Sequence, residues 1–100
     1  MIAKTIVENR ALKGITNSHP LDIRYKKKEG EIVQRRIEPY EIKTEKVLDE
    51  YGYMKAVTFL YGYDISMSVP YKHRHIKRWI IDRFITLRLI DNVVFKKRAF

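Results

Sequence analysis

The segment from Lys72 to Phe84 combines lysines, arginines, two histidines and a tryptophan with an apolar continuation. Alternation along an extended strand puts Arg78 on one face and Lys77 with Trp79 on the other. An unpaired charge is costly to bury, so cations on both faces make a poor core strand. The pattern is typical of the wall of an anion-binding site.

Phosphate is the anion that these side chains suit best. Guanidinium groups fork onto phosphate oxygens and stay charged at any relevant pH. The predicted phosphate-binding residues of this segment are Arg74, Lys77, Arg78 and Arg83. The alternative is that Arg83 pairs with an acid such as Asp82 and that Arg74 is solvated.

Arg36 is a further candidate from another predicted strand. Arg35 and Arg36 are neighbours, so they point to opposite faces and only one can face a groove; we select Arg36. The lysines at positions 26–28 occupy a predicted turn, where they either widen the positive field or form a solvated hairpin tip.

Two aromatic residues are candidates for base recognition. Tyr53 and Trp79 could stack on bases, which is how small barrels hold single strands without reading their sequence. Trp79 shares its predicted face with Ile81, and the alternative is a core aromatic. Tyr53 shares a face with Lys55, so both a groove edge and a core position remain open for it.

The alternate histidines His73 and His75 would face the same way on a strand, as two metal ligands do. The surrounding cations would repel a metal ion, and no acidic third ligand is close in sequence. We therefore predict no metal site. Hydrogen bonding of both histidines to phosphate or base suits them better.

Catalytic motifs are absent from the sequence. The four glycines are scattered, so no glycine-rich phosphate loop is present. Ser66 and Ser68 have Asp64 and histidines nearby, but no nucleophile-elbow pattern surrounds them. Only Asp82 and Asp91 carry acid after residue 64, too few for a typical magnesium nuclease site. We predict a non-enzymatic protein that needs no cofactor.

The net charge of +9 is unevenly distributed. Residues 65–100 carry nine lysines and arginines against two aspartates, a net charge of +7, which leaves +2 for residues 1–64. A one-sided basic field attracts polyanions, and nucleic acid is the first partner to expect. A solvated face, an acidic partner protein or an anionic membrane surface would suit the same field.

The 100 residues fit a single domain, with 45% hydrophobic and 33% charged residues, as in folded proteins. The absence of cysteine excludes disulfides and is compatible with a reducing cytoplasm. The first ten residues lack the apolar core of a signal peptide, and no apolar run approaches the roughly 18 residues that span a bilayer. We therefore expect a cytoplasmic protein without a membrane segment.

The elements that must position these residues are one helix and five strands. An apolar stripe predicts a helix at about residues 3–16, and alternation predicts a strand from Leu21 to Tyr25. A polar turn leads into a strand at 31–38 that bends at Pro39, where the apolar parity shifts. We expect a loop or short helical turn at 43–50 and a strand at 51–60.

A loop is predicted at 61–70, followed by strands at about 74–81 and 83–90. Asp91 and Asn92 form the last turn, Phe95 is the last anchor, and the basic tail 96–100 is expected to be partly frayed. A sheet of five curved strands hides its edges best by closing into a barrel, here over about residues 21–95. The predicted fold class is mainly β with an N-terminal helix.

The order of these pieces resembles the WYL domain, an Sm-like β-barrel module of bacterial transcription regulators. Residues 18–30 resemble the family's opening strand and turn, 35–42 its second strand, 52–57 the name-giving segment and 77–91 its final segment. Gly52 and Met54 stand where the family has tryptophan and leucine, and Tyr53 is kept. The resemblance implies a barrel whose basic groove binds nucleic-acid strands or nucleotide-like ligands.

Two functions follow as expectations. The first is a non-enzymatic WYL-like regulator that binds single-stranded DNA, RNA or a nucleotide through a basic groove. The second, suggested by the small size of the chain, is a phage-type adaptor that docks on acidic surfaces of host nucleic-acid or transcription machinery. Self-association is expected with either function, since an open barrel edge invites pairing between chains.

Overall fold

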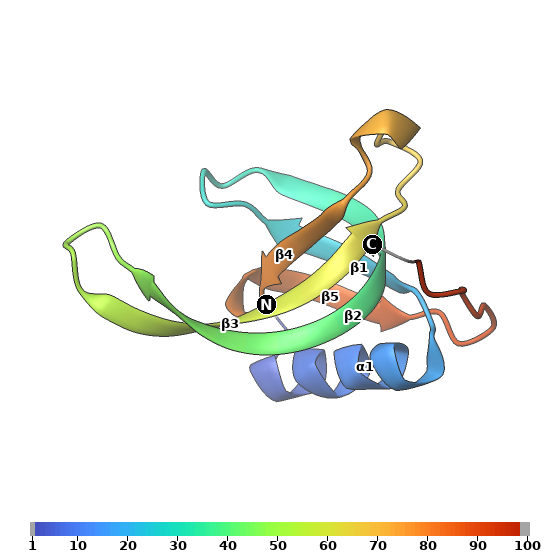
Figure 1. Cartoon of the computed structure of the whole chain (residues 1–100), viewed down its shortest axis with the longest axis horizontal. Helices are drawn as coiled ribbons and strands as arrows, with labels where there is room; N and C mark the ends of the chain where they lie inside the picture. The colour runs from blue at the N-terminus through green and yellow to red at the C-terminus, as the bar shows by residue number, and fades with distance from the viewer. Residues whose placement is uncertain (1, 99–100) are drawn as a thin grey trace.

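The computed structural model describes residues 2–98, which form one helix and a five-stranded antiparallel sheet (Figure 1). The predicted fold class is confirmed. No helix in this range is long and apolar enough to cross a membrane. The elements are α1 (Lys4–Asn17), β1 (Leu21–Lys26), β2 (Ile32–Leu48), β3 (Met54–Asp64), η1 (Tyr71–His73), β4 (Ile76–Ile80), η2 (Ile81–Arg83) and β5 (Phe84–Leu89), where η marks a single 3₁₀ turn.

The helix α1 agrees with the predicted range to within one residue at each end. It buries Val7, Ala11 and Gly14 on the side that packs on β2 and β5. A Cβ atom at Gly14 would lie 2.9 Å from Cγ of Pro39, so the helix touches the bend of β2 closely. Ser18 ends the helix in the left-handed conformation, with φ of 56°.

The long strand β2 bends where the sequence predicts it. Its register with β3 shifts between Pro39 and Glu41. Beyond the bend, β2 and β3 continue as a hairpin that projects from the rest of the sheet (Figure 1). The prediction of a loop or helical turn at 43–50 is therefore wrong for 43–48, and β3 also extends to Asp64, into the loop predicted at 61–70. Both faces of the projecting hairpin meet solvent, so it shows little of the alternation that identifies a half-buried strand.

The sheet has the strand order β4-β3-β2-β1-β5 and curls so that its two edge strands, joined by η2, approach each other. Tyr25 of β1 links them from inside. Its ring lies edge to face with Trp79 of β4, at 5.2 Å between centroids, and with Phe84 of β5, at 5.3 Å. Its hydroxyl accepts a hydrogen bond from the N–H of Ile80 at 2.9 Å. This curvature keeps one side of the sheet for the core and turns the other side to solvent.

The C-terminal segment docks more firmly than predicted. Phe95 is buried, as expected of the last anchor, and its N–H donates to the carbonyl of Ser18 at 2.8 Å. Arg98 donates from Nε to Glu38 at 2.9 Å and lies over the ring of Tyr63. The buried carboxylate of Glu38 requires a counter-charge, which Arg98 supplies, so this contact ties the tail to β2. The predicted tail also includes residues 99 and 100, which lie outside the described residues.

Candidate anion-binding site

The cations around β4 do not gather into one groove. Arg74 folds back onto its own loop, where Nε donates to the carbonyl of Val69 at 3.1 Å and a terminal nitrogen to that of Ser66 at 3.2 Å. Lys77 lies 3.4 Å from the carboxylate of Asp64, which is fully buried. These two predicted phosphate ligands hold the structure of residues 64–77 together.

The next two candidates point elsewhere. Arg78 reaches Glu45 on β2 at 3.2 Å and lies over the ring of Phe59 at 4.6 Å. Arg83 ends η2, half-exposed, and its side chain makes no hydrogen bond or ion pair with another residue of the described range. Alternation along β4 sends Lys77 and Arg78 to opposite faces, so the strand cannot offer both to one ligand.

The predicted stacking residues are also separated. Trp79 belongs to the core, with 6% of its surface exposed, so its ring is not available to a base. Tyr53 is 72% exposed at the end of the projecting hairpin, where Asp49 accepts a hydrogen bond from its N–H. His73 and His75 lie on the surface, and Nδ1 of His75 is 2.8 Å from the carbonyl of His73. Within residues 2–98, no three histidine, cysteine or acidic side chains gather as metal ligands would.

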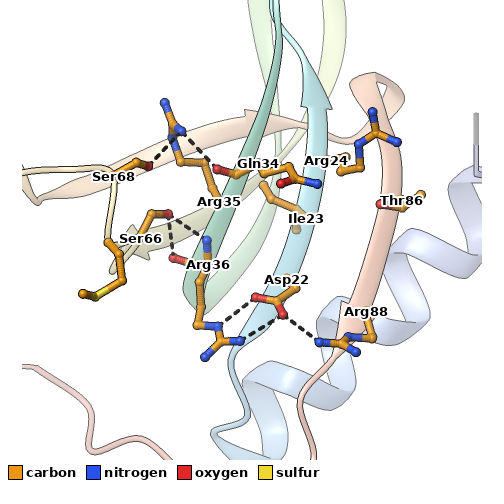
Figure 2. Close-up of a pocket in the computed structure, with 11 residues that line it drawn as sticks. Asp22, Ile23, Arg24, Gln34, Arg35, Arg36, Ser66, Ser68, Thr86 and Arg88 are labelled. Carbon is orange, nitrogen blue, oxygen red and sulfur yellow. Dashed lines mark hydrogen bonds and ion pairs between the residues drawn. The ribbon is translucent and has the colours of Figure 1, made fainter.

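A different surface collects cations around a concavity. A hollow of about 510 Å³ opens on the side of β1, β2 and β5 that faces away from the core, beside the loop after β3 (Figure 2). Of the predicted site residues, only Arg36 lies there. The lining residues are Asp22, Ile23, Arg24, Gln34, Arg35, Arg36, Ser66, Met67, Ser68, Thr86 and Arg88.

Strand register explains why these polar residues meet. Asp22 of β1 lies directly opposite Arg36 of β2 on one side and Arg88 of β5 on the other. Arg24, two residues along, lies opposite Gln34 and Thr86 in the same way. Residues that face each other across neighbouring strands point to the same side of a sheet, so three strands contribute to one polar surface.

Asp22 holds two of the arginines in place. Arg36 donates to both of its carboxylate oxygens, at 2.8 and 3.0 Å, and Arg88 donates to one of them at 2.9 Å (Figure 2). The hydrogen bond from Arg36 keeps the pKa of Asp22 below its ordinary value, and Arg88 acts in the same direction against the effect of burial. The two guanidinium groups thus converge on one anionic centre, although both remain largely open to solvent.

The rim of the hollow comes from the loop after β3. Arg35 reaches the buried carboxylate of Asp64 at 3.4 Å and donates to the hydroxyl of Ser68 at 3.3 Å. The hydroxyl of Ser66 accepts a hydrogen bond from the N–H of Arg36 at 2.8 Å and lies against Asp64. Ser66 therefore has a structural role, while Ser68 borders the opening.

We name Arg24, Arg36 and Arg88, with Arg35 at the rim, the arginine face. Four guanidinium groups and the carboxylate of Asp22 line the hollow, and the buried Asp64 behind it pairs with Arg35, so the lining is strongly positive. The side chain of Arg24 has no hydrogen-bond or ion-pair partner among residues 2–98, so it is free to meet a ligand. A surface of this kind binds anionic groups, and phosphate in particular, through forked hydrogen bonds.

Comparisons with known proteins find a likeness in structure and none in sequence. No protein-family profile matches the chain, and neither does any curated protein. Among solved structures, Proteasome accessory factor B/C (PafBC) of Arthrobacter aurescens has a similar fold, with a TM-score of 0.63 and 13% identity over 94% of this chain. The chain spans 13% of the length of PafBC. The likeness concerns the fold alone, and it supports a WYL-like fold for this chain.

Proposed function

We propose that this chain is a non-enzymatic, WYL-type regulatory module that binds a nucleotide or single-stranded nucleic acid through the arginine face. The observation that carries the proposal is that four arginines from β1, β2 and β5 line one hollow, where two of them meet at Asp22 (Figure 2). The net charge of +9 adds a long-range field of the same sign.

The dimensions of the hollow suit a phosphorylated ligand. Its volume of about 510 Å³ lies within the roughly 300–1,000 Å³ typical of small-molecule sites, which is room for one nucleotide. Arg36 and Arg88, which donate to the carboxylate of Asp22, would also bind a phosphate group, and Arg24 would add a second contact. The hydroxyls of Ser68 and Thr86 and the amide of Gln34 would meet sugar and base edges.

Salt-dependent binding tests the proposal. Fluorescence anisotropy with labelled 12-nucleotide DNA and RNA would be measured at several salt concentrations, for the wild type and for Arg24→Gln/Arg36→Gln/Arg88→Gln. Each lost phosphate contact on a single strand lowers the slope of log affinity against log salt by about 0.7, so the triple variant, which removes two such contacts, should lose about 1.4. Competition by mononucleotides would separate a nucleotide site from a strand site.

The matched control is Lys13→Gln/Lys46→Gln/Lys55→Gln, which removes the same charge from exposed positions outside the hollow. The proposal predicts a much smaller loss for this variant, because only general attraction is reduced. Equal losses in the two triple variants would show that binding follows net charge and would refute a dedicated site.

A second candidate function is docking on an acidic partner protein. It is favoured by the forked contact of Arg36 with Asp22, because that contact is already a guanidinium–carboxylate pair. Pull-down from lysate after nuclease treatment separates the two functions. Recovery of one acidic protein that the arginine triple variant fails to recover would favour docking, and recovery of nucleic acid alone would favour the first function.

A further inference from the structure

The projecting part of the β2–β3 hairpin has two open edges. On β2, only Ile32–Ile37 pairs with β1, and on β3, only Phe59–Tyr63 pairs with β4. The remainder of each strand pairs with the other strand of the hairpin and with nothing else in the described chain. Figure 1 shows this ribbon extending well beyond the curled sheet. The outer edge of β3 at residues 54–58 therefore presents unpaired backbone groups to solvent.

The two edges differ in charge. The open edge of β2 carries charged residues along most of its length: Glu41, Lys43, Glu45 and Lys46. Charged side chains are the usual protection of an exposed edge against pairing with another chain. The open edge of β3 has the sequence Met-Lys-Ala-Val-Thr, with Lys55 as its only charge. It is the less protected edge.

We propose that Met54–Thr58 is a self-association surface, on which two copies of this chain pair antiparallel about Ala56. This register uses all five open positions, because β4 occupies the edge from Phe59 onward. It places Met54 opposite Thr58 of the other copy and Lys55 opposite Val57 of the other copy, so no like charges face each other. A register centred on Lys55 would instead oppose two lysines.

Charge also favours a second copy at this place. Residues 41–58 contain four acids and three bases, a net charge of −1, whereas the rest of the chain carries +10. Two such bodies repel each other. The longest dimension of the molecule is 43 Å, and the hairpin lies at one end of that axis (Figure 1). Pairing along the hairpin keeps the bodies apart by more than the screening length of about 8 Å in physiological salt.

Two substitutions at Val57 test the proposal with opposite expected effects. In the dimer, Val57→Lys places one lysine opposite Lys55 of the other copy in each of two symmetry-related pairs, and Val57→Glu places one glutamate there in each pair. Within one chain, position 57 lies opposite Glu45, so lysine is favourable and glutamate unfavourable for the monomer. A general effect on folding would therefore change in the direction opposite to the effect on dimerisation.

Sedimentation equilibrium without nucleic acid measures the dimer. Protein concentrations up to about 0.3 mM are needed, because a five-residue strand pair gives a small and weak interface. The wild-type mass should rise from 12.0 kDa toward twice that value, with a dissociation constant roughly tenfold higher for Val57→Lys and lower for Val57→Glu. Thr44→Lys and Thr44→Glu, on β2 of the same hairpin, are the matched controls and should leave the dissociation constant of the dimer nearly unchanged.

Amide hydrogen exchange locates the contact. The alternate amides of residues 54–58 that point away from β2 should exchange more slowly as the protein concentration rises, and those of 43–47 should not. A wild type that stays at 12.0 kDa, Val57 variants that change association in the same direction, or protection outside 54–58 would each overturn the proposal. The assay contains no polyanion, so its failure is independent of the arginine face.

Discussion

Replacing Asp22 by Asn separates the two roles of the arginine face, stability and anion binding. Asp22 accepts three charge-assisted hydrogen bonds, two from Arg36 and one from Arg88. Asparagine has nearly the same shape but lacks the negative charge that holds both guanidinium groups. Asp22→Asn should therefore lower the stability of the fold and raise its affinity for phosphate.

The size of the stability change follows from the solvent exposure of the three side chains. The side chains of Asp22, Arg36 and Arg88 are 30%, 48% and 74% exposed, so each pair is largely screened by solvent. Exposed pairs contribute about 0.2–1 kcal/mol each, which gives a loss of about 1 kcal/mol for the two together. In a domain of this size, that loss lowers Tm by about 4–8 °C.

The affinity change has the opposite sign. A phosphate held by Arg36 and Arg88 would lie about 5 Å from the Asp22 carboxylate, and at that distance in a water-like medium the repulsion is about 1 kcal/mol. Removing it should strengthen binding of a labelled oligonucleotide about fivefold. Asp82→Asn is the matched control, because Asp82 is exposed in η2, outside the hollow, and its loss changes the net charge equally.

Anisotropy titrations and thermal unfolding of both variants measure these effects. Weaker binding by Asp22→Asn would mean that Asp22 positions the two arginines for the ligand instead of competing with it. Equal gains in the two variants would mean that only net charge matters. Either result would refute the reasoning that the Asp22 carboxylate opposes phosphate binding by Arg36 and Arg88.

Three further predictions follow from other contacts. The pKa of Asp22 is depressed in the folded state, so the contribution of Asp22 to stability is present above its ordinary pKa of 3.8 and is lost as the pH falls through the folded pKa. The free energies of unfolding of wild type and Asp22→Asn, measured in urea, should therefore converge in acid. A difference that stays constant with pH would contradict this. Tyr25→Phe removes the acceptor of the Ile80 N–H and should cost about 1 kcal/mol in urea unfolding, whereas Tyr71→Phe, at an exposed tyrosine, should cost nothing measurable. Gly14→Ala puts a Cβ atom 2.9 Å from Cγ of Pro39 and should lower Tm, although alanine has the better helix propensity. Thr16→Ala, on the exposed side of the helix, should not lower Tm. A rise in Tm for Gly14→Ala would show that the helix can shift away from Pro39 at no cost.

Parts of the arginine face were within reach of the sequence. The alternation of Leu21, Ile23 and Tyr25 with Asp22 and Arg24 already indicates that Arg24 points away from the core. The last strand contains the same signal, since Arg88 alternates with the buried Leu87. The prediction was placed on β4 instead because cations are dense around Trp79. In the structure, most of those cations bind carboxylates or loop carbonyls of the chain itself.

By itself, the sequence determined the order of the elements, the helix at the N-terminus, the bend at Pro39 and the excess of positive charge, because these depend on local periodicity, proline geometry and composition. Only the tertiary structure decided which cations are free. Asp64 takes Lys77 and Arg35, and Glu45 takes Arg78, through contacts between residues 13 to 33 positions apart. The register of β1 with both β2 and β5 brings Arg36 and Arg88 to the same aspartate. Such pairings depend on how the sheet curls, which no local pattern encodes.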